Sequence, residues 1–526
     1  MTQNAGKHRA HREKSTKKSN LDIGKGIQIW YNKVTTTQTK PERMPDLMIV
    51  QTSGNDKQKI DAANRFLDTL TKLGVSSLLK QSNIRKESRK IAGEKDGNRR
   101  SAYTVFTFLI VLVFQGQNLF RYLESKKRDC ACSKNTYYRF LNNCHYNWGK
   151  FITLLAAKVI SWLEPLTDSK REKCFVLDDS VIERERSKKV ELLARVYDHV
   201  IGKTVKGFNL LMLGWTDHYS FIPVGFNMMS SAKEKNRIMG MDSRIDKRTS
   251  GYQTRAAAVM QKPDAAIALI KNALNMGITA KYLLMDTCFT NEPFIGRVQS
   301  EGLDVIGMLK DNKQQYWYHG RLYGLRDLAK LIRFDTQSDI SGSVFVKTKY
   351  LSIPVRLVFV RNRNKRNEYI VILTTDCSLP DREVVRYYGS RWSIECCFKV
   401  CKSLLKLGSE FHGVGYDMTV STTAIVFARF IILEWIRRED NDPRTMGDLF
   451  FLVYDEVKDI ELTDALKRLL NIFVEGIKSG NITLSESIRL MLIDWFLSQP
   501  MFIQALFPAF IAEARLEDST LPIPCQ

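Results

Sequence analysis

Two acidic residues each follow an apolar run and are candidates for catalysis. Asp178 ends the run CFVL, and Asp286 ends the run YLLM. Each run predicts a buried strand, so each carboxylate would stand at the carboxyl end of a strand, where α/β sheets place their active sites. Acidic residues are also common turn formers at strand ends, so for these two residues alone a structural role stays open.

A third candidate group lies in the segment YYGSRWSIECCFKVCK, which contains Tyr388, Arg391, Glu395 and Lys402. The last three stand 3, 7 and 14 positions after the first. At about 100° per residue, these positions share one stripe of a single helix, so a phenol, two cations and a carboxylate would face the same way. An ordinary ion pair between Arg391 and Glu395 would produce the same pattern.

The spacing of these four residues resembles the YREK signature of the insertion-sequence-four type of DDE transposases. The acidic motifs are similar as well. Asp178 is followed by Asp179 and Ser180, which fits the family's first motif with Asp178 as the ligand and leaves Asp179 as an alternative. Asp286 is followed by Thr, Cys and Phe, which fits the second motif. The resemblance covers about residues 174–407 and is weak or generic elsewhere.

The resemblance implies an RNase H-like catalytic core and an enzyme that moves an insertion sequence, a kind of transposable element. It implies that Asp178, Asp286 and Glu395 are catalytic and hold two divalent metal ions. Carboxylate oxygens favour Mg²⁺ or Mn²⁺. Two such ions about 3.5–4 Å apart activate the attacking oxygen and stabilise the leaving oxygen in phosphodiester cleavage.

The resemblance also implies that DNA is the partner. Arg391 and Lys402 would bind phosphates, and Tyr388 would hydrogen-bond a phosphate or stack. Members of the family nick one strand, form and reopen a hairpin, and join the ends to a target. We therefore expect cut-and-paste transposition, with the element's terminal inverted repeats and the target DNA as double-stranded partners and a homodimer in the DNA complex.

The charge balance agrees with a polyanionic partner. Lys and Arg number 80 against 57 Asp and Glu, a formal net charge of +23. Proteins with this excess bind nucleic acid by releasing condensed counterions, although ribosomal and membrane-surface proteins are basic too. The apolar content of 44% and the charged content of 26% are typical of folded globular chains.

Hydrophobic periodicity divides the chain into four parts. Residues 1–45 are polar and basic and predict a flexible arm, and residues 46–165 predict a helical DNA-binding domain. Residues 166–407 alternate strands and helices and predict an α/β domain with a β-rich insertion at about 312–378, for which the resemblance implies an RNase H-like mixed sheet. Residues 408–526 predict a helical C-terminal region that could pair two protomers.

The expected location is the bacterial cytosol, in association with the nucleoid. Ten cysteines lack the regular framework of a secreted domain, and no apolar stretch follows the basic N-terminus. The apolar segments 103–114 and 419–436 predict buried core helices, because the first is too short for a membrane span and the second contains Arg429.

Several other residues have a structural interpretation that we favour. Cys130, Cys132, Cys144 and His145 have poor zinc-ligand spacing, and Cys396, Cys397 and Cys401 are expected to be small buried groups. His218 is expected to be structural rather than catalytic, and Trp317 to fill a core rather than to stack on a base. The polar stretch 230–255, rich in Lys and Arg, predicts a solvated loop that could touch the DNA backbone.

Two other functions compete with transposition. An RNase H-like nuclease would hydrolyse DNA without strand transfer. A domesticated DNA-binding protein would keep the basic surface but would need none of the three carboxylates, so their presence argues against it.

Overall fold

The computed structural model describes residues 66–85, 101–115, 118–125, 132–167, 171–199, 201–332, 340–361, 369–411, 413–439 and 446. Apart from Ser125, these residues belong to one compact unit formed by Ala63–Glu124 and Cys132–Tyr454. The expected basic arm at 1–45, Cys130 and the C-terminal helices beyond residue 446 lie outside the described residues.

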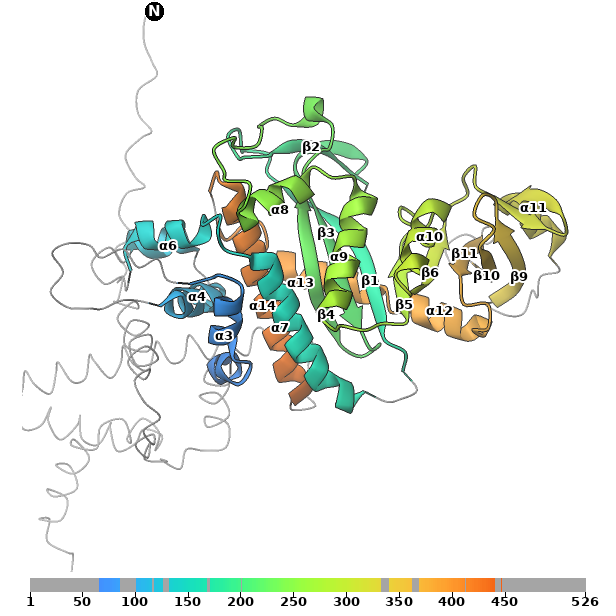
Figure 1. The fold of residues 1–526 in the computed structure, drawn as a ribbon, viewed down its shortest axis with the longest axis horizontal. Helices are drawn as coiled ribbons and strands as arrows, with labels where there is room; N and C mark the ends of the chain where they lie inside the picture. Colours follow the sequence, from blue (N-terminus) through green and yellow to red (C-terminus); the bar gives the residue numbers. More distant parts are fainter. Residues whose placement is uncertain are drawn as a thin grey trace, which may run out of the picture. The chain divides into compact units, whose positions relative to one another are not determined.

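A mixed sheet forms the centre of the structure, as Figure 1 shows. Its strands are β1 (Cys174–Glu183), β2 (Ala194–Asp198), β3 (Lys203–Thr216), β4 (Phe221–Met229), β5 (Tyr282–Met285) and β6 (Asp304–Leu309). Strand β3 runs antiparallel to β1 and β4, whereas β5 runs parallel to both β1 and β6. The order β4-β3-β1-β5-β6 with these directions is RNase H-like, so the expected fold class is confirmed.

The β-rich insertion expected between Asp286 and Glu395 extends the same sheet. It comprises β7 (Gln315–Tyr318), β8 (Arg321–Gly324), α11 (Leu325–Leu331), β9 (Ile340–Thr348), β10 (Pro354–Arg361) and β11 (Tyr369–Thr374). Strand β11 pairs antiparallel with β6, and β10, β9, β7 and β8 follow in that order. The insertion therefore leaves the sheet at β6 and returns beside it, which brings the chain back to the core before Glu395.

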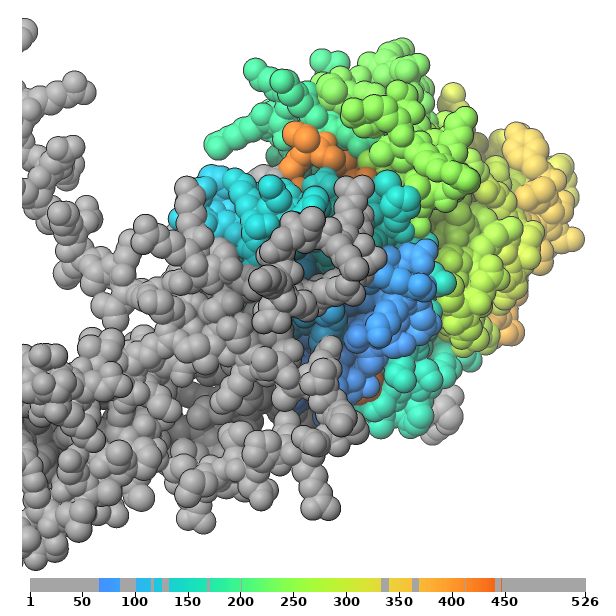
Figure 2. All heavy atoms as spheres, turned by 60° about the vertical axis from the view of Figure 1, so that its left-hand side comes forward, coloured from blue at the N-terminus to red at the C-terminus, as the bar shows by residue number. Residues whose placement is uncertain are grey.

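Helices pack on the central sheet and on one another. They are α3 (Val75–Gln81), α4 (Ala102–Val111), α5 (Leu119–Ser125), α6 (Lys134–Leu141), α7 (Trp148–Leu163), α8 (Ser250–Ala258), α9 (Lys262–Asn275), α10 (Glu292–Ser300), α12 (Asp381–Gly389), α13 (Trp392–Ser403) and α14 (Tyr416–Glu439). Helices α7 and α14 pack on each other and on β4, α9 packs on β3 and β4, and α13 packs on β1. In Figure 2 the first helices, in blue, lie against the neighbouring cyan and teal segments, and α3 contacts both α4 and α7.

Helix α14 is a core helix despite its apolar composition. Within the part of the chain that the structure describes, it is the one helix long and apolar enough to cross a membrane, and its apolar window is entirely buried in protein. Its Arg429 is fully buried. The guanidinium donates to Glu410 at 2.5 and 3.0 Å and to the carbonyl oxygens of Leu109, Ile110 and Leu405. These bonds tie α14 to the end of α4 and to the segment after α13.

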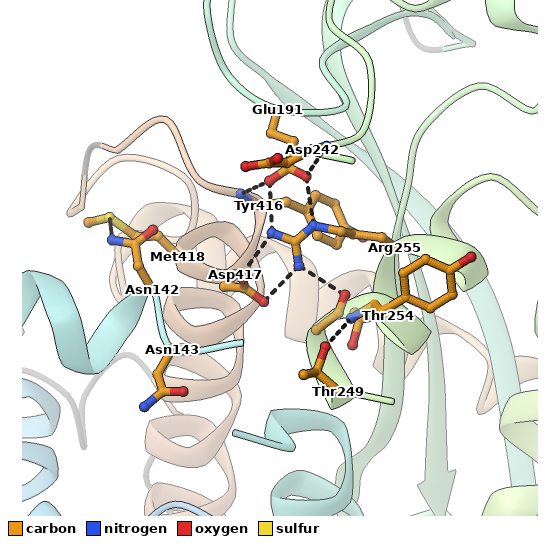
Figure 3. Close-up of polar contacts among 12 residues, drawn as sticks. Asn142, Asn143, Glu191, Asp242, Thr249, Thr254, Arg255, Tyr416, Asp417 and Met418 are labelled. Atoms are coloured by element: carbon orange, nitrogen blue, oxygen red, sulfur yellow. Dashed lines mark hydrogen bonds and ion pairs between the residues drawn. The ribbon is translucent and has the colours of Figure 1, made fainter. Parts of the chain in front are cut away.

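A second buried arginine joins distant parts of the chain, and we call its surroundings the Arg255 cluster. Figure 3 shows the Arg255 guanidinium between Glu191 and Asp417. It donates to Glu191 at 2.6 and 2.8 Å and to Asp417 at 2.9 and 2.7 Å. Glu191 also accepts from the backbone N–H groups of Asp242 and Tyr416. Burial acts to raise the pKa of Glu191, but the hydrogen bonds from Arg255, Asp242 and Tyr416 and the charge of Arg255 together outweigh it and hold that pKa below its ordinary value.

The Arg255 cluster corrects one expectation for the basic stretch 230–255. The sequence pattern predicts that Arg255 is solvated like the other cations of that stretch. Only 1% of Arg255 is exposed, because two acids from remote segments surround it. Arg244 and Arg248 are exposed as expected, and each binds an acid of its own loop, Asp242 or Asp246, at 2.8 Å.

Candidate active site

Strand β1 presents two adjacent carboxylates to different neighbours. Side chains alternate across a strand, so Asp178 and Asp179 point to opposite faces of the sheet. Asp178 contacts Arg391, just before α13, whereas Asp179 accepts from Lys262 Nζ at 3.1 Å, at the start of α9. The Asp178 carboxylate also accepts from the Asp179 backbone N–H at 2.8 Å. Of the two candidates for the first acid, Asp178 is therefore the one that faces the helix of Glu395.

The Arg391 guanidinium joins two of the three predicted acids. Its Nη1 donates to Asp178 Oδ2 at 3.0 Å, and its Nη2 donates to Glu395 Oε1. The Arg391 and Asp178 side chains are each only 15% exposed, so solvent screens their pairing weakly. One planar cation thus links Asp178 of β1 to Glu395 of α13.

Asp286 reaches the same region from the neighbouring strand. In the parallel pairing of β1 with β5, Leu177 is level with Met285, so Asp178 and Asp286 follow at equivalent positions. Asp286 Oδ1 accepts from the Cys288 backbone N–H at 3.0 Å. Burial first, and then the negative charge of Asp286, raise the pKa of Asp178 from 3.8 to about 7. The Asp179 N–H and Arg391 act in the opposite direction without cancelling this effect.

The expectation of a single helix carrying all four residues of the YREK pattern is wrong. Helix α12 ends at Gly389 and α13 begins at Trp392, so Tyr388 lies on the helix before the one that carries Glu395. Between them, backbone N–H groups bond three residues back, as from Arg391 to Tyr388 O at 3.0 Å. A Gly-Ser pair at 389–390 favours such a break, because glycine loses the most backbone freedom in a helix and serine competes for backbone hydrogen bonds.

Tyr388 and Lys402 nevertheless lie near the acids. The Arg391 guanidinium carbon is 5.8 Å from the centroid of the Tyr388 ring, and burial raises the pKa of Tyr388 to about 12, so its phenol keeps its proton at neutral pH. Lys402, near the far end of α13, donates to Ser180 Oγ at 2.8 Å and to Val181 O at 2.9 Å. Ser180 shares a face of β1 with Asp178, so Lys402 and Arg391 approach the strand from the same side.

The donor set suits a hard divalent cation, although a positive group already stands among the acids. Asp178, Asp286 and Glu395 offer only oxygen atoms, as Mg²⁺ and Mn²⁺ prefer. Burial first, and then the charge of Asp286, disfavour the ionised form of Asp178, and a divalent ion would favour that form. Among the described residues, however, no three His, Cys, Asp or Glu side chains are already close enough to hold an ion. Because Arg391 pairs with two of the acids, an ion could bind all three only after that guanidinium moves.

The lesser candidates divide into those that match expectation and those that do not. Cys397 and Cys401 are buried, with their sulfur atoms 3.9 Å apart, but Cys396 is exposed, contrary to its expected burial. Trp317 is 38% exposed and donates from Nε1 to Lys349 O, so it does not fill a core. It lies on an outward face of β7, at the margin of the insertion, where too few elements surround it for burial.

His218 contacts the junction of α12 and α13. Its Nδ1 contacts Ser390 Oγ, and its Nε2 is 3.9 Å from Cys174 Sγ. Sequence reasoning missed this link, as it missed the ion pair of Asp179 with Lys262. Neither has a signal in the sequence, because both join residues from separate elements.

Comparison with known proteins adds information about the family. A family model described as "DDE superfamily endonuclease" matches residues 99–322, and one described as "Transposase DDE domain" matches residues 245–414. Together the two matches support a DDE transposase, in agreement with the coarser part of the resemblance seen in the sequence. DDE transposase families generally use divalent metal ions.

Other comparisons add little. No curated protein matches the sequence. Among solved structures, the chain is similar to the "Drosophila P element transposase strand transfer complex", with 12% sequence identity over 80% of this chain and 94% of the other. The TM-score is 0.20, so this similarity carries no argument about the fold.

Proposed function

We propose that this protein is a transposase of the insertion-sequence-four type that performs cut-and-paste transposition of an insertion sequence. The observation that carries the proposal is the convergence of Asp178, Glu395 and Arg391, together with the electrostatic effect of Asp286 on Asp178. Asp178 and Asp286 follow the paired residues of neighbouring parallel strands, and Arg391 links Asp178 to Glu395 of the following helix. Carboxylates so arranged in a basic protein suit metal-dependent phosphoryl transfer on DNA. The two matched family models support the same chemistry.

In the proposed site, Asp178, Asp286 and Glu395 would hold two Mg²⁺ or Mn²⁺ ions. When bound, the ions would lower the pKa of the attacking hydroxyl and stabilise the leaving oxyanion. Asp286 is already oriented by the Cys288 N–H, and Glu395 is held on the first turn of α13. The carboxylates' own part is to supply the oxygen ligands for these ions.

The cations of the site would bind the DNA backbone. We propose that Arg391 exchanges its two carboxylate partners for a phosphate next to the scissile bond, for which its planar fork is suited. Lys402 would release Ser180 and bind a second phosphate as a point charge. Tyr388, with its proton retained, would donate a hydrogen bond to a phosphate oxygen or stack on a base.

The proposed partners are the terminal inverted repeats of the element and the target DNA, bound by a homodimer in the DNA complex. The net charge of +23 supports a DNA partner, and the exposed Arg244 and Arg248 offer contacts to the backbone. We place the protein in the bacterial cytosol, in association with the nucleoid. The hairpin intermediate and the two-ion requirement belong to the same proposal.

A cleavage assay with Glu395→Gln tests the proposal. The change keeps the size of the side chain but removes the charge that would hold an ion, so Mg²⁺-dependent cleavage of labelled end DNA should fall by a factor on the order of 10³. DNA binding, measured by gel shift in EDTA, should stay within about twofold because the basic surface is unchanged.

The matched control is Cys396→Ser, at the exposed position next to Glu395 on the same helix. It should cleave like the unaltered protein. Cleavage by Glu395→Gln at the normal rate would remove the proposal. Cleavage without joining to target DNA, in an assay that scores both products, would favour the alternative of an RNase H-like nuclease.

A further inference from the structure

His218 makes three contacts below the break between α12 and α13. Its Nδ1 meets the hydroxyl of Ser390, and its Nε2 faces the Cys174 thiol at 3.9 Å, at the start of β1. Its ring also stacks on Tyr387 of α12, with centroids 4.7 Å apart and planes 19° from parallel. One imidazole therefore touches the first strand of the sheet, the end of α12 and the residue that precedes Arg391.

The backbone around His218 is held in a defined conformation. His218 has φ 69°, in the left-handed region, where Asn, Asp and His are the least disfavoured residues apart from glycine. Its N–H donates to Thr216 Oγ1 at 3.0 Å. The buried Asp217 accepts from the N–H groups of Tyr219 and Ser220 at 3.0 and 2.6 Å and from Thr167 Oγ1 at 2.8 Å. The turn between β3 and β4 thus aims the ring at the junction.

The charges around the ring favour its neutral form. Burial lowers the pKa of His218, and Arg386 on α12 and Arg171 lower it further. Asp217 and a backbone hydrogen bond to Glu172 act in the opposite direction without prevailing. A neutral ring whose Nε2 carries the proton leaves Nδ1 free to accept from the Ser390 hydroxyl.

We propose that His218 is a positioning residue that fixes Ser390 and thereby aims Arg391 and Glu395 at Asp178. Ser390 is directly bonded to Arg391, and the Ser390 and Arg391 carbonyl oxygens accept from Ser393 and Ile394 at 3.1 Å in the first turn of α13. A shift of Ser390 therefore moves the start of that helix. Helix α13 carries Glu395 one turn later, so both groups move together relative to β1.

The size of the effect follows from the geometry of catalysis. A misplacement of about 1 Å away from the chemistry can cost about 100-fold in rate. Ser390→Ala leaves the His218 ring stacked on Tyr387, and loss of either side chain leaves the buried face of α13 in place, so the expected change is no larger than that. We expect a loss of about 10- to 100-fold in the rate of the chemical step, with little change in DNA affinity.

The inference rests on the proposed function, and the experiment separates the two. Single-turnover cleavage and DNA affinity are measured for His218→Gly, His218→Asn and Ser390→Ala. Glycine accepts the positive φ, so His218→Gly removes the ring without straining the turn. Asparagine also tolerates this φ and places a polar atom where Nδ1 stood, so it should restore the rate to within about threefold of the unaltered protein. The matched control is His199→Gly, which changes an exposed histidine at the end of β2.

The expected pattern is specific to positioning. His218→Gly should slow cleavage at least as much as Ser390→Ala, because it also removes the ring that stacks on Tyr387. The double variant should be little slower than His218→Gly, because the Ser390 contact is already lost in that variant. Cleavage by His218→Gly at the normal rate, or equal slowing by His218→Gly and His218→Asn, would overturn the inference. If His218→Gly does not fold, Ser390→Ala decides alone, and a normal rate for it overturns the inference. Normal cleavage by Glu395→Gln would instead refute the proposed function.

Discussion

Replacing Asp178 with asparagine should stabilise the protein in the absence of metal, although it removes a proposed catalytic group. The pKa of Asp178 is raised from 3.8 to about 7, chiefly by burial and then by Asp286. Each tenfold change in proton affinity is worth about 1.4 kcal/mol, so the ionised carboxylate costs the folded state about 4 kcal/mol at pH 8. This figure already includes the favourable effect of Arg391.

The sign of the pH dependence follows from the direction of the pKa change. A carboxyl whose pKa is higher in the folded state binds its proton more tightly there, so its contribution to stability is present at low pH. That contribution is lost as the pH rises from about 4 through about 7. Relative to Asp178→Asn, the unaltered protein should therefore lose about 4 kcal/mol across this window and remain constant above it.

The assay is chemical unfolding in EDTA at pH 5 and pH 8, followed by the fluorescence of buried tryptophans. The matched control is Asp179→Asn at the adjacent position, whose ion pair with the partly exposed Lys262 should be worth at most about 1 kcal/mol at either pH. Addition of Mn²⁺ should then stabilise the unaltered protein but not Asp178→Asn. A stability difference that is the same at both pH values, or a less stable Asp178→Asn at pH 8, would refute the reasoning.

Three further changes probe other contacts. Arg391→Gln should tighten Mn²⁺ binding in the absence of DNA by about tenfold or more, because the ion no longer competes with a guanidinium for Asp178 and Glu395. An unchanged Mn²⁺ affinity in calorimetry would contradict this. Gly251→Ala should lower the free energy of unfolding by about 1–3 kcal/mol, because the added Cβ would lie 2.6 Å from a carboxylate oxygen of Asp417. Gly240→Ala, which has open space around it, should lower it much less in the same thermal unfolding experiment. Arg429→Met should cost about 3–5 kcal/mol because Glu410 would be left buried without its partner, and an undiminished unfolding midpoint would count against that pairing.

The strands of the site were predictable because their local signal is strong. Cys174–Leu177 and Tyr282–Met285 are short apolar runs buried on both faces, and such runs read directly as parallel strands of a covered sheet. The residue after each run must then stand at the same edge. The prediction that Tyr388, Arg391, Glu395 and Lys402 share one face of a helix was less reliable, because it assumed an unbroken helix across Gly389. The structure has two helices there, which end and begin on either side of residues 390–391.

Burial of charged residues was not predictable. Arg255 resembles its exposed neighbours in composition, and it is buried only because Glu191 and Asp417, 64 and 162 residues away, supply opposite charges. The role of Arg391 was half predicted, since its pairing with Glu395 follows from a spacing of four residues. Its bond to Asp178 depends on how α13 packs on β1, which no local pattern specifies.

The Arg255 cluster limits how this protein can be divided or exchanged between relatives. Its cation lies on α8, which packs on the central sheet, but one of its two acids, Asp417, lies at the start of the long helix α14. If the sheet were transplanted alone into another scaffold, half of the neutralising charge would be left behind and a desolvated guanidinium would face only Glu191. The sheet and the helix beginning at Tyr416 should therefore be inherited as one block.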